Sequence, residues 1–276
     1  MNSDCAFFIG ADHKICQDYA SSRTDRDISY VIVADGCSSS PDTDIGARFL
    51  VKAAETFLYQ VEMNDTPKRS LELYYEQSAR FASTTSRLLK LDPSSLDATI
   101  LTIKANNERF VASIYGDGVV AMVRTDGKIE IYSVEFVEGY PQYVSYTLDN
   151  SRRQQFNAVT TNYKEITHML IPDPENKTRV DVSDRVIEFY TGRREDYYCV
   201  AVLSDGVHSF SEITETPTGR TGKPVPMSEI VTQMLAFKTT KGDFIYRRMQ
   251  AFQKLCQTRN WRNHDDLSVG VVYLGY

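Results

Sequence analysis

The sequence lacks the features of membrane-spanning, secreted and zinc-thiolate proteins. No part of its 276 residues approaches the ~20 consecutive apolar residues that cross a bilayer. The segment from Met1 to Phe8 has neither the basic start nor the long apolar core of a signal peptide. The five cysteines are scattered without a C-x-x-C pair, which fits reduced thiols better than a disulfide framework. We therefore expect a cytoplasmic protein with no membrane partner.

Basic residues are fewer than acidic ones. Asp and Glu number 37 against 31 Lys and Arg, and the formal net charge is −6. That balance argues against nucleic acid or an anionic membrane surface as the main partner. Glycine and proline are spread thinly and no internal repeat is present, so nothing marks a flexible linker. We expect a single domain over residues 1–276, and a monomer.

Short apolar segments come in blocks and do not alternate strictly with helical ones. A meander of four strands, rich in β-branched residues, is predicted between residues 97 and 134. Apolar periodicity predicts helices at 45–61, 68–89, 228–237 and 243–256. In the second of these helices, the candidate core residues are Leu71, Tyr75, Phe81 and Leu88. This order of elements favours an α+β fold with antiparallel sheets.

Three strand-like runs carry aspartate at equivalent ends. Apolar runs lead into Asp35 and into Asp205, and in the reverse order an apolar run follows Asp265. A strand that ends in Asp and an antiparallel neighbour that begins with Asp put their carboxylates at one edge of a sheet. Such carboxylates repel one another unless a positive group lies between them. Mg²⁺ or Mn²⁺, which prefer oxygen ligands, is the natural counter-charge.

These aspartates belong to an ordered set that resembles the metal-dependent protein phosphatase family of the protein phosphatase 2C type. The matching stretches are Gln17-Asp18-Tyr19-Ala20, Val33-Ala34-Asp35-Gly36, Gly46-Ala47, Asp97-Ala98-Thr99, Gly116-Asp117-Gly118, Leu203-Ser204-Asp205-Gly206-Val207 and His264-Asp265-Asp266-Leu267-Ser268. One Asp-Gly pair is a weak signal, because turns contain many of them. The ordered set spans residues 13–273 and is much more specific. The residues that follow Asp35-Gly36 look more like the bacterial branch of the family.

The resemblance implies an α+β fold in which a central sandwich of two antiparallel β-sheets is flanked by α-helices (α-β-β-α). It also implies two or three Mg²⁺ or Mn²⁺ ions at one end of the sandwich. Asp35 would bridge two metals, and Gly36 would offer its carbonyl oxygen to one of them. Asp205 and Asp265 would complete the protein ligands of the other metal.

Two further aspartates receive roles from the resemblance. Asp117 would hold a weaker third metal together with Asp205, although Gly116-Asp117-Gly118 can also be read as a simple hairpin turn. Asp18 would orient metal-bound waters, and its neighbour Gln17 stands where many members have glutamate. The alternative for this pair is a solvated polar dipeptide before a strand.

The chain departs from the family pattern where substrate phosphate is held. Many members have an arginine five residues before the position of Asp18, and this chain has His13 there. Arginine grips phosphate with two parallel hydrogen bonds, whereas histidine offers one donor. Lys14 is adjacent and can substitute as a point charge, so His13 and Lys14 are the candidate phosphate ligands. Cys37 stands where eukaryotic members often have a histidine, and no arginine follows it within a phosphate-binding loop.

The implied reaction is hydrolysis of phosphoserine and phosphothreonine in phosphorylated proteins. A metal-bridging hydroxide would attack phosphorus directly, because two cations lower the pKa of a shared water. The chain would thus be a Mg/Mn-dependent protein-serine/threonine phosphatase, a phosphoric monoester hydrolase. The catalytic residues would be Asp35, Asp205, Asp265 and Asp18.

Two other functions stay open on the sequence alone. The departures at His13, Gln17 and Cys37 also fit a sensor or binding module with little or no turnover. A small-molecule phosphomonoesterase would use the same chemistry. Substrate choice would lie in residues 136–196, an irregular, tyrosine-rich segment that we expect to combine some strand with a flap over the site. Its basic pairs, such as Arg152-Arg153, are either solvated loop charges or contacts for an acidic phosphoprotein.

Overall fold

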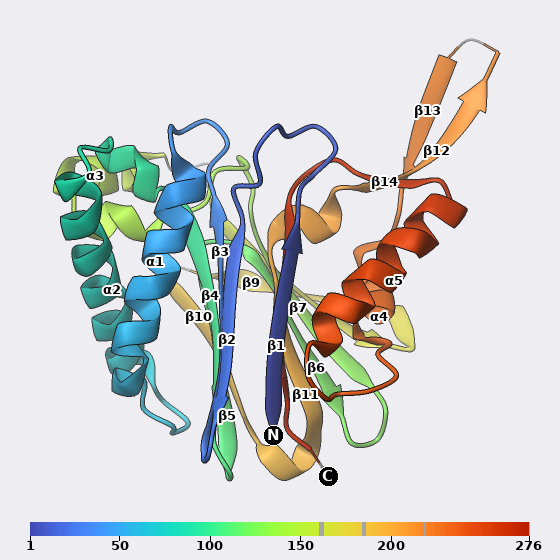
Figure 1. Cartoon of the computed structure of the whole chain (residues 1–276), viewed down its shortest axis with the longest axis horizontal. Coiled ribbons are helices and arrows are strands. Elements are labelled where there is room, and N and C mark those ends of the chain that lie inside the picture. Colours follow the sequence, from blue (N-terminus) through green and yellow to red (C-terminus); the bar gives the residue numbers. More distant parts are fainter. Residues whose placement is uncertain (160–162, 184–185, 218, 276) are drawn as a thin grey trace.

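Two antiparallel sheets pack face to face at the centre of the molecule (Figure 1). The computed structural model describes residues 1–159, 163–183, 186–217 and 219–275. The seven-stranded sheet has the order β1 (Asn2–Phe8), β15 (Leu267–Tyr273), β11 (Tyr197–Leu203), β6 (Gly118–Arg124), β7 (Ile129–Phe136), β8 (Lys164–Ile171) and β9 (Asp173–Ser183). The five-stranded sheet has the order β10 (Ile187–Arg193), β5 (Arg109–Tyr115), β4 (Ala98–Ala105), β3 (Ile28–Gly36) and β2 (Tyr19–Asp25).

Helices cover the outer face of each sheet (Figure 1). The five-stranded sheet is covered by α1 (Thr43–Phe57) and α2 (Lys68–Leu88), and the seven-stranded sheet by α4 (Met227–Leu235) and α5 (Phe244–Thr258). The remaining helix, α3 (Asn150–Ala158), lies beside the α1–α2 end of the molecule. Short 3₁₀ turns are η1 (Leu58–Gln60), η2 (Pro93–Leu96), η3 (Val144–Thr147), η4 (Arg194–Asp196) and η5 (Asp205–His208). The predicted α-β-β-α sandwich is confirmed.

The apolar residues divide among three cores because side chains alternate across each strand. In β3, Val31 and Val33 face the core between the two sheets, whereas Ile32 and Ala34 face α1 and α2. All four are fully buried. A strand covered on both faces therefore reads as a continuous apolar run, which is the pattern that leads into Asp35.

The predicted core of α2 is half wrong. Leu71 and Tyr75 are fully buried, but Phe81 and Leu88 are 50% and 79% exposed. The six residue steps from Tyr75 to Phe81 turn a helix by roughly 600°, which carries Phe81 away from the face that Tyr75 occupies. Small residues fill the buried face instead, among them Ala79 and Ala82. The helical repeat of buried positions is therefore formed partly by alanine residues, which a search for large apolar residues overlooks.

Strands occupy much of the segment that the sequence left irregular. β8 and β9 extend the seven-stranded sheet, and β10 forms an edge of the five-stranded sheet. A buried ion pair of 2.9 Å between Lys164 on β8 and Glu188 on β10 joins the two sheets. The irregular part is residues 137–159, which contain η3 and α3 and which we call the flap.

A small third sheet stands apart from the sandwich. Its strands are β12 (Phe210–Thr216), β13 (Gly219–Pro224) and β14 (Trp261–Asn263). The β12–β13 hairpin projects away from the body of the molecule (Figure 1). None of the helices in the described ranges combines the length and the apolar character needed to cross a membrane.

A buried lysine ties α1 to the five-stranded sheet. Lys104 on β4 is 6% exposed, and its ammonium donates hydrogen bonds to the carbonyl oxygens of Leu58 at 3.2 Å and Val61 at 2.7 Å. These carbonyls follow the last turn of α1, and that of Leu58 also accepts a hydrogen bond of 3.1 Å from the Val61 N–H. The lysine side chain therefore satisfies the end of the helix from the neighbouring sheet.

Lys104→Met should destabilise the fold without altering its architecture. Methionine fills a similar volume but leaves the buried carbonyl of Val61 without its donor, at a cost of about 1–3 kcal/mol. Urea unfolding measures the loss. Lys128→Met, in an exposed hairpin, is the matched control and should change stability by less than about 0.5 kcal/mol. Equal stability of the two variants would contradict this account of Lys104.

Candidate active site

A cavity of about 620 Å³ lies at one end of the sandwich. Its wall is built by the loops after β1 and β3, the start of β4, the β5–β6 turn, η5 and the flap. Six of the residues predicted from sequence line it, namely His13, Asp35, Gly36, Asp117, Asp205 and Asp265. Positions separated by more than 200 residues in the chain thus meet on one surface.

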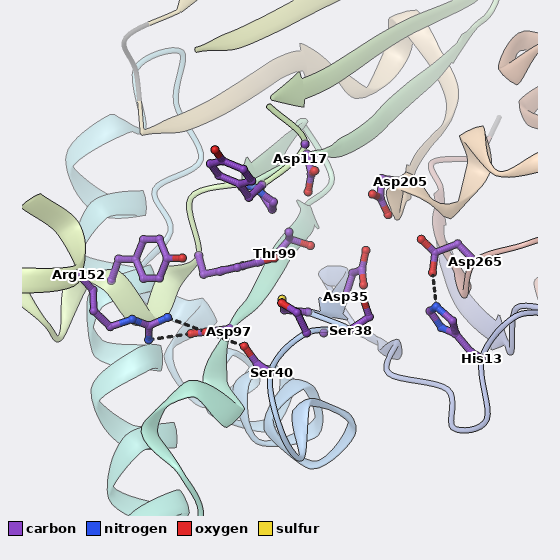
Figure 2. Close-up of a pocket in the computed structure, with 18 residues that line it drawn as sticks. His13, Asp35, Ser38, Ser40, Asp97, Thr99, Asp117, Arg152, Asp205 and Asp265 are labelled. Atoms are coloured by element: carbon purple, nitrogen blue, oxygen red, sulfur yellow. Dashed lines mark hydrogen bonds and ion pairs between the residues drawn. The ribbon is translucent and has the colours of Figure 1, made fainter. Parts of the chain in front are cut away.

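The register of the sheets explains why the aspartates meet. β11 and β15 are antiparallel neighbours, with Leu203 opposite Val269, so the residues that follow one strand and those that precede the other lie at the same edge. Asp205 lies two residues after β11, and Asp265 lies two residues before β15. Asp35 ends β3 in the facing sheet, opposite Thr99 of β4. Figure 2 shows the carboxylates of Asp35, Asp205 and Asp265 turned toward the same space.

Asp117 reaches the cavity from a tight turn, so the hairpin reading of its motif is compatible with a place on the cavity wall. The turn joins β5 to β6, and the flanking Gly116 and Gly118 have φ angles of 105° and 129°. Residues with side chains rarely adopt these angles. Asp117 itself is 9% exposed and lines the cavity. The hairpin therefore presents the carboxylate that the family resemblance assigns to a third metal.

The gathered carboxylates disfavour one another's charge. Burial, together with the nearby Asp18 and Asp205, raises the pKa of Asp35 well above its usual range. Burial and the charge of Asp205 likewise raise the pKa values of Asp117 and Asp265. Among the described residues that line the cavity, the basic side chains are His13 and Arg152, and each is already paired with a carboxylate. Acidic side chains thus outnumber basic ones on the cavity wall.

Asp18 lies behind the cavity wall. It is 1% exposed and one carboxylate oxygen accepts a hydrogen bond of 2.8 Å from Ser204 Oγ. Its other oxygen, Oδ1, has no hydrogen-bond partner among the described residues. Burial is the main cause that raises the pKa of Asp18 to about 7. The neighbouring Gln17 turns its amide away from this group and donates to Thr43 Oγ1 at 2.6 Å.

His13 is held by the two consecutive aspartates that precede β15. Its Nε2 lies 3.3 Å from Asp265 Oδ1, and its Nδ1 lies 3.1 Å from Asp266 Oδ2. Burial opposes a charge on the ring, but the two carboxylates outweigh it and raise the pKa of His13. Both ring nitrogens therefore face protein carboxylates. Lys14, the other candidate phosphate ligand, is exposed and is not part of the cavity wall.

Asp266 organises the loop that carries His13. It is 2% exposed, and its two oxygens accept backbone hydrogen bonds from Gly10 at 2.7 Å and Gln17 at 2.6 Å. The sequence showed Asp266 only as a neighbour of Asp265. Through these two bonds Asp266 holds residues 10–17 against the end of the sandwich, which places His13 on the cavity wall.

The sequence analysis left the role of Arg152 open and gave Asp97 none. The Arg152 guanidinium donates two hydrogen bonds to the carboxylate of Asp97, at 2.9 and 2.6 Å, and both residues line the cavity. Tyr140, Tyr143 and Tyr146 of the flap complete this side of the wall. The abundance of tyrosine in residues 136–196 was the one signal in the sequence that pointed to this wall.

His208 and His264 lie outside the cavity, whereas Cys37 belongs to its wall. His208 Nε2 lies 3.0 Å from Ser133 Oγ, and His264 Nδ1 lies 2.8 Å from Asp12 Oδ2. Neither histidine is among the lining residues. Cys37 does line the cavity, with its sulfur 3.1 Å from Ser39 Oγ.

Hard divalent cations suit the donor set of this cavity. Carboxylate and carbonyl oxygens are the ligands that Mg²⁺ and Mn²⁺ prefer, and the mutual repulsion of the carboxylates calls for positive charge. In the described ranges, no three His, Cys, Asp or Glu side chains are grouped so as to hold one metal ion. Mg²⁺ usually keeps several waters and takes only one or two protein carboxylates, so sparse protein coordination agrees with its habits.

Asp18→Asn should stabilise the metal-free protein at alkaline pH. The folded protein retains a proton on Asp18 that the unfolded chain has already lost, so this group lowers stability as pH rises from 3.8 to about 7. Asparagine keeps an acceptor for Ser204 but carries no charge. In EDTA the variant should exceed the wild type by on the order of 1–3 kcal/mol at pH 8, with the difference vanishing near pH 4. Urea unfolding across this pH range measures it.

Asp126→Asn is the control of opposite sign. The backbone N–H of Lys128 holds the pKa of the exposed Asp126 below its ordinary value, so this carboxylate favours the folded state as pH rises. Its replacement should lower stability at pH 8. An Asp18→Asn variant that is less stable than the wild type at pH 8, or equally stable at every pH, would contradict the account of Asp18.

Comparison with known proteins gives a family and a fold. The sequence model of the protein phosphatase 2C family matches residues 11–252. No match is found among curated proteins. Of the solved structures, the serine/threonine phosphatase Stp1 from Staphylococcus aureus is similar with a TM-score of 0.57 at 12% identity, over 99% of this chain and 95% of that one.

Two further structures share the architecture. A bacterial serine phosphatase has a TM-score of 0.57 at 12% identity, over 100% of this chain and 99% of that one. The phosphatase domain of SpoIIE from Bacillus subtilis, solved with a fragment of its regulatory domain, has a TM-score of 0.50 at 10% identity, over 99% of this chain and 63% of that one. At these identities the likeness concerns the fold.

Proposed function

The chain belongs to the protein phosphatase 2C family, and from that premise we propose that it is a Mg²⁺- or Mn²⁺-dependent phosphatase of phosphoserine and phosphothreonine in proteins. One observation carries the proposal. Asp35, Asp205 and Asp265 come from three separate segments and line one cavity with their carboxylates turned inward (Figure 2). Partly buried carboxylates that repel one another are a structural cost, and a cation-dependent reaction gives a reason for it.

The proposed ligands follow the wall of the cavity. Asp35 would serve two ions and the Gly36 carbonyl one of them, while Asp205 and Asp265 would serve the other. Asp117 would hold a third ion with Asp205. The raised pKa of Asp117, to which the charge of Asp205 contributes, supports this pairing because it reflects their proximity.

Such ions, when bound, would supply an activated water and neutralise charge on the phosphoryl group. The chain's own residues have supporting tasks. Asp18 lies buried beside Asp35 and is fixed by Ser204, so it is suited to accept a hydrogen bond from water at the ions. His13 fixes Asp265 by an ion pair and is a weaker candidate for holding phosphate, since both of its nitrogens face carboxylates.

Direct hydrolysis without a covalent enzyme intermediate fits the cavity better than a cysteine mechanism. Cys37 is the thiol on the wall, but residues 38–43 contain no arginine to cradle phosphate beside it. We further propose a cytoplasmic, monomeric enzyme that acts on phosphorylated proteins. All five cysteines are free, which supports a reducing compartment.

Asp35→Asn and Asp205→Asn should each abolish metal-dependent hydrolysis of p-nitrophenyl phosphate while preserving the fold. Each change removes one negative charge from the proposed ion site and keeps the side-chain volume, so we expect a loss of at least about 10²-fold in kcat. Steady-state assays with Mn²⁺, alongside circular dichroism, measure both properties. Asp126→Asn, in the β6–β7 hairpin, is the control. Wild-type turnover by the Asp35 or Asp205 variant would refute the proposed function.

A further inference from the structure

We propose that Asp97 and Arg152 form a clamp that holds the flap across the cavity, and that this clamp determines how the polypeptide part of a phosphoprotein is bound. The inference rests on the proposed function and adds to it two positioning residues that act on substrate specificity. Neither residue is assigned a role in the reaction at phosphorus.

The clamp consists of four hydrogen bonds to one buried carboxylate. Asp97 is 3% exposed and accepts two bonds from the Arg152 guanidinium, at 2.9 and 2.6 Å. Ser145, also in the flap, donates to Asp97 Oδ1 at 2.7 Å, and Ser40 donates to Oδ2 at 3.0 Å. Paired, charge-assisted bonds of this kind are strong and fix orientation as well as distance. Three segments of the chain are thereby joined at Asp97.

Both ends of the clamp are set firmly in place. On the sandwich side, the carbonyl of Asp97 accepts a hydrogen bond of 2.8 Å from the backbone N–H of Cys37, in the loop that follows Asp35 and Gly36. On the flap side, Asp149 caps α3 by accepting a bond of 3.1 Å from the Arg152 N–H. The guanidinium also lies 4.6 Å above the Tyr146 ring, which adds a cation–π contact.

The position of the clamp separates it from the proposed reaction centre. In Figure 2, the Arg152–Asp97 pair lies on one side of Asp35, and Asp205 and Asp265 lie on the other. A phosphoryl group held by the latter carboxylates and their ions would extend its ester toward the flap. Tyr140, which lines the cavity and is 46% exposed, offers an aromatic ring that suits a peptide chain, and the buried Tyr143 packs behind it against Tyr146. The clamp would fix this wall.

A purely structural role makes a different prediction. A buried ion pair often adds little net stability, but removal of one partner leaves the other charged and unpaired. If the pair only supported the fold, its loss would affect all substrates alike. If it positions the flap, kcat/KM should fall more for a phosphopeptide than for a small aryl phosphate, which does not extend along the wall.

The experiment compares kcat/KM for a phosphothreonine peptide and for p-nitrophenyl phosphate, both with Mn²⁺. Arg152→Gln should lower the peptide-to-aryl ratio by about tenfold, mainly through KM of the peptide. Asp97→Asn should do the same. The double variant should be no worse than Arg152→Gln, because both changes open one clamp. Arg152→Lys keeps the charge but not the planar fork, so it should resemble Arg152→Gln.

Two further variants guard the interpretation. Arg153→Gln, one residue along α3 and bonded to Asn150, should leave the ratio unchanged. Ser145→Ala removes one bond while retaining the ion pair, and it should lower the ratio by a smaller factor. This milder variant keeps the clamp testable even where the Arg152 or Asp97 variants do not fold. An unchanged ratio in both Arg152→Gln and Ser145→Ala, or an equal fall in Arg153→Gln, would overturn the clamp.

The proposed function and the clamp can fail separately. Wild-type protein that hydrolyses the aryl phosphate but not the peptide would overturn the clamp's part in peptide binding and leave the phosphatase chemistry standing. Wild-type protein that hydrolyses neither would refute the proposed function. The clamp is then tested by the affinity of the same phosphopeptide for the Mn²⁺-loaded protein, which Arg152→Gln should weaken about tenfold. Equal affinities would overturn it.

Discussion

Repulsion among partly buried carboxylates is the constraint on which this molecule depends. Two facing sheets bring Asp35, Asp205 and Asp265 to one cavity, where the charge of Asp205 makes Asp35 and Asp265 harder to ionise. The apolar core between the sheets opposes this cost, since each fully buried valine or leucine contributes roughly 1.5–3 kcal/mol. Burial of residues such as Val31 and Val202 therefore offsets the free-energy cost of bringing the carboxylates together when no cation is bound.

The loops around the cavity repeat one solution at smaller scale, in which a buried aspartate ties a loop down through several donors. Asp266 gathers Gly10, Gln17 and His13, and Asp97 gathers the flap and the loop after Asp35. These structural carboxylates have protein donors at both oxygens, whereas His13 and the Asp266 N–H both contact the same oxygen of the proposed ligand Asp265. The acidic residues at this end of the molecule thus form two groups, one that fixes the loops and one that we propose binds cations.

Much of the architecture could be predicted because its signals are local. A run of apolar residues ending in Asp35 indicates both a strand buried on its two faces and the polar end of that strand. Asp265 precedes a similar run, which predicts that this strand is antiparallel to the one that leads to Asp205. The edge strand β2 gave no such signal, since residues 21–25 are all polar. Phe81 and Leu88 were misplaced because the buried face of α2 consists largely of alanine, serine and tyrosine. The bond between Arg152 and Asp97 joins residues 55 positions apart and leaves no local pattern in either segment.

The claim that the carboxylates trap divalent ions is tested most directly by anomalous scattering from crystals soaked in Mn²⁺. The account predicts two peaks bridged by Asp35, one near the Gly36 carbonyl and one near Asp205 and Asp265, with a third, weaker peak beside Asp117. A map without a peak at Asp35, from crystals in which these side chains keep the arrangement of Figure 2, would contradict it.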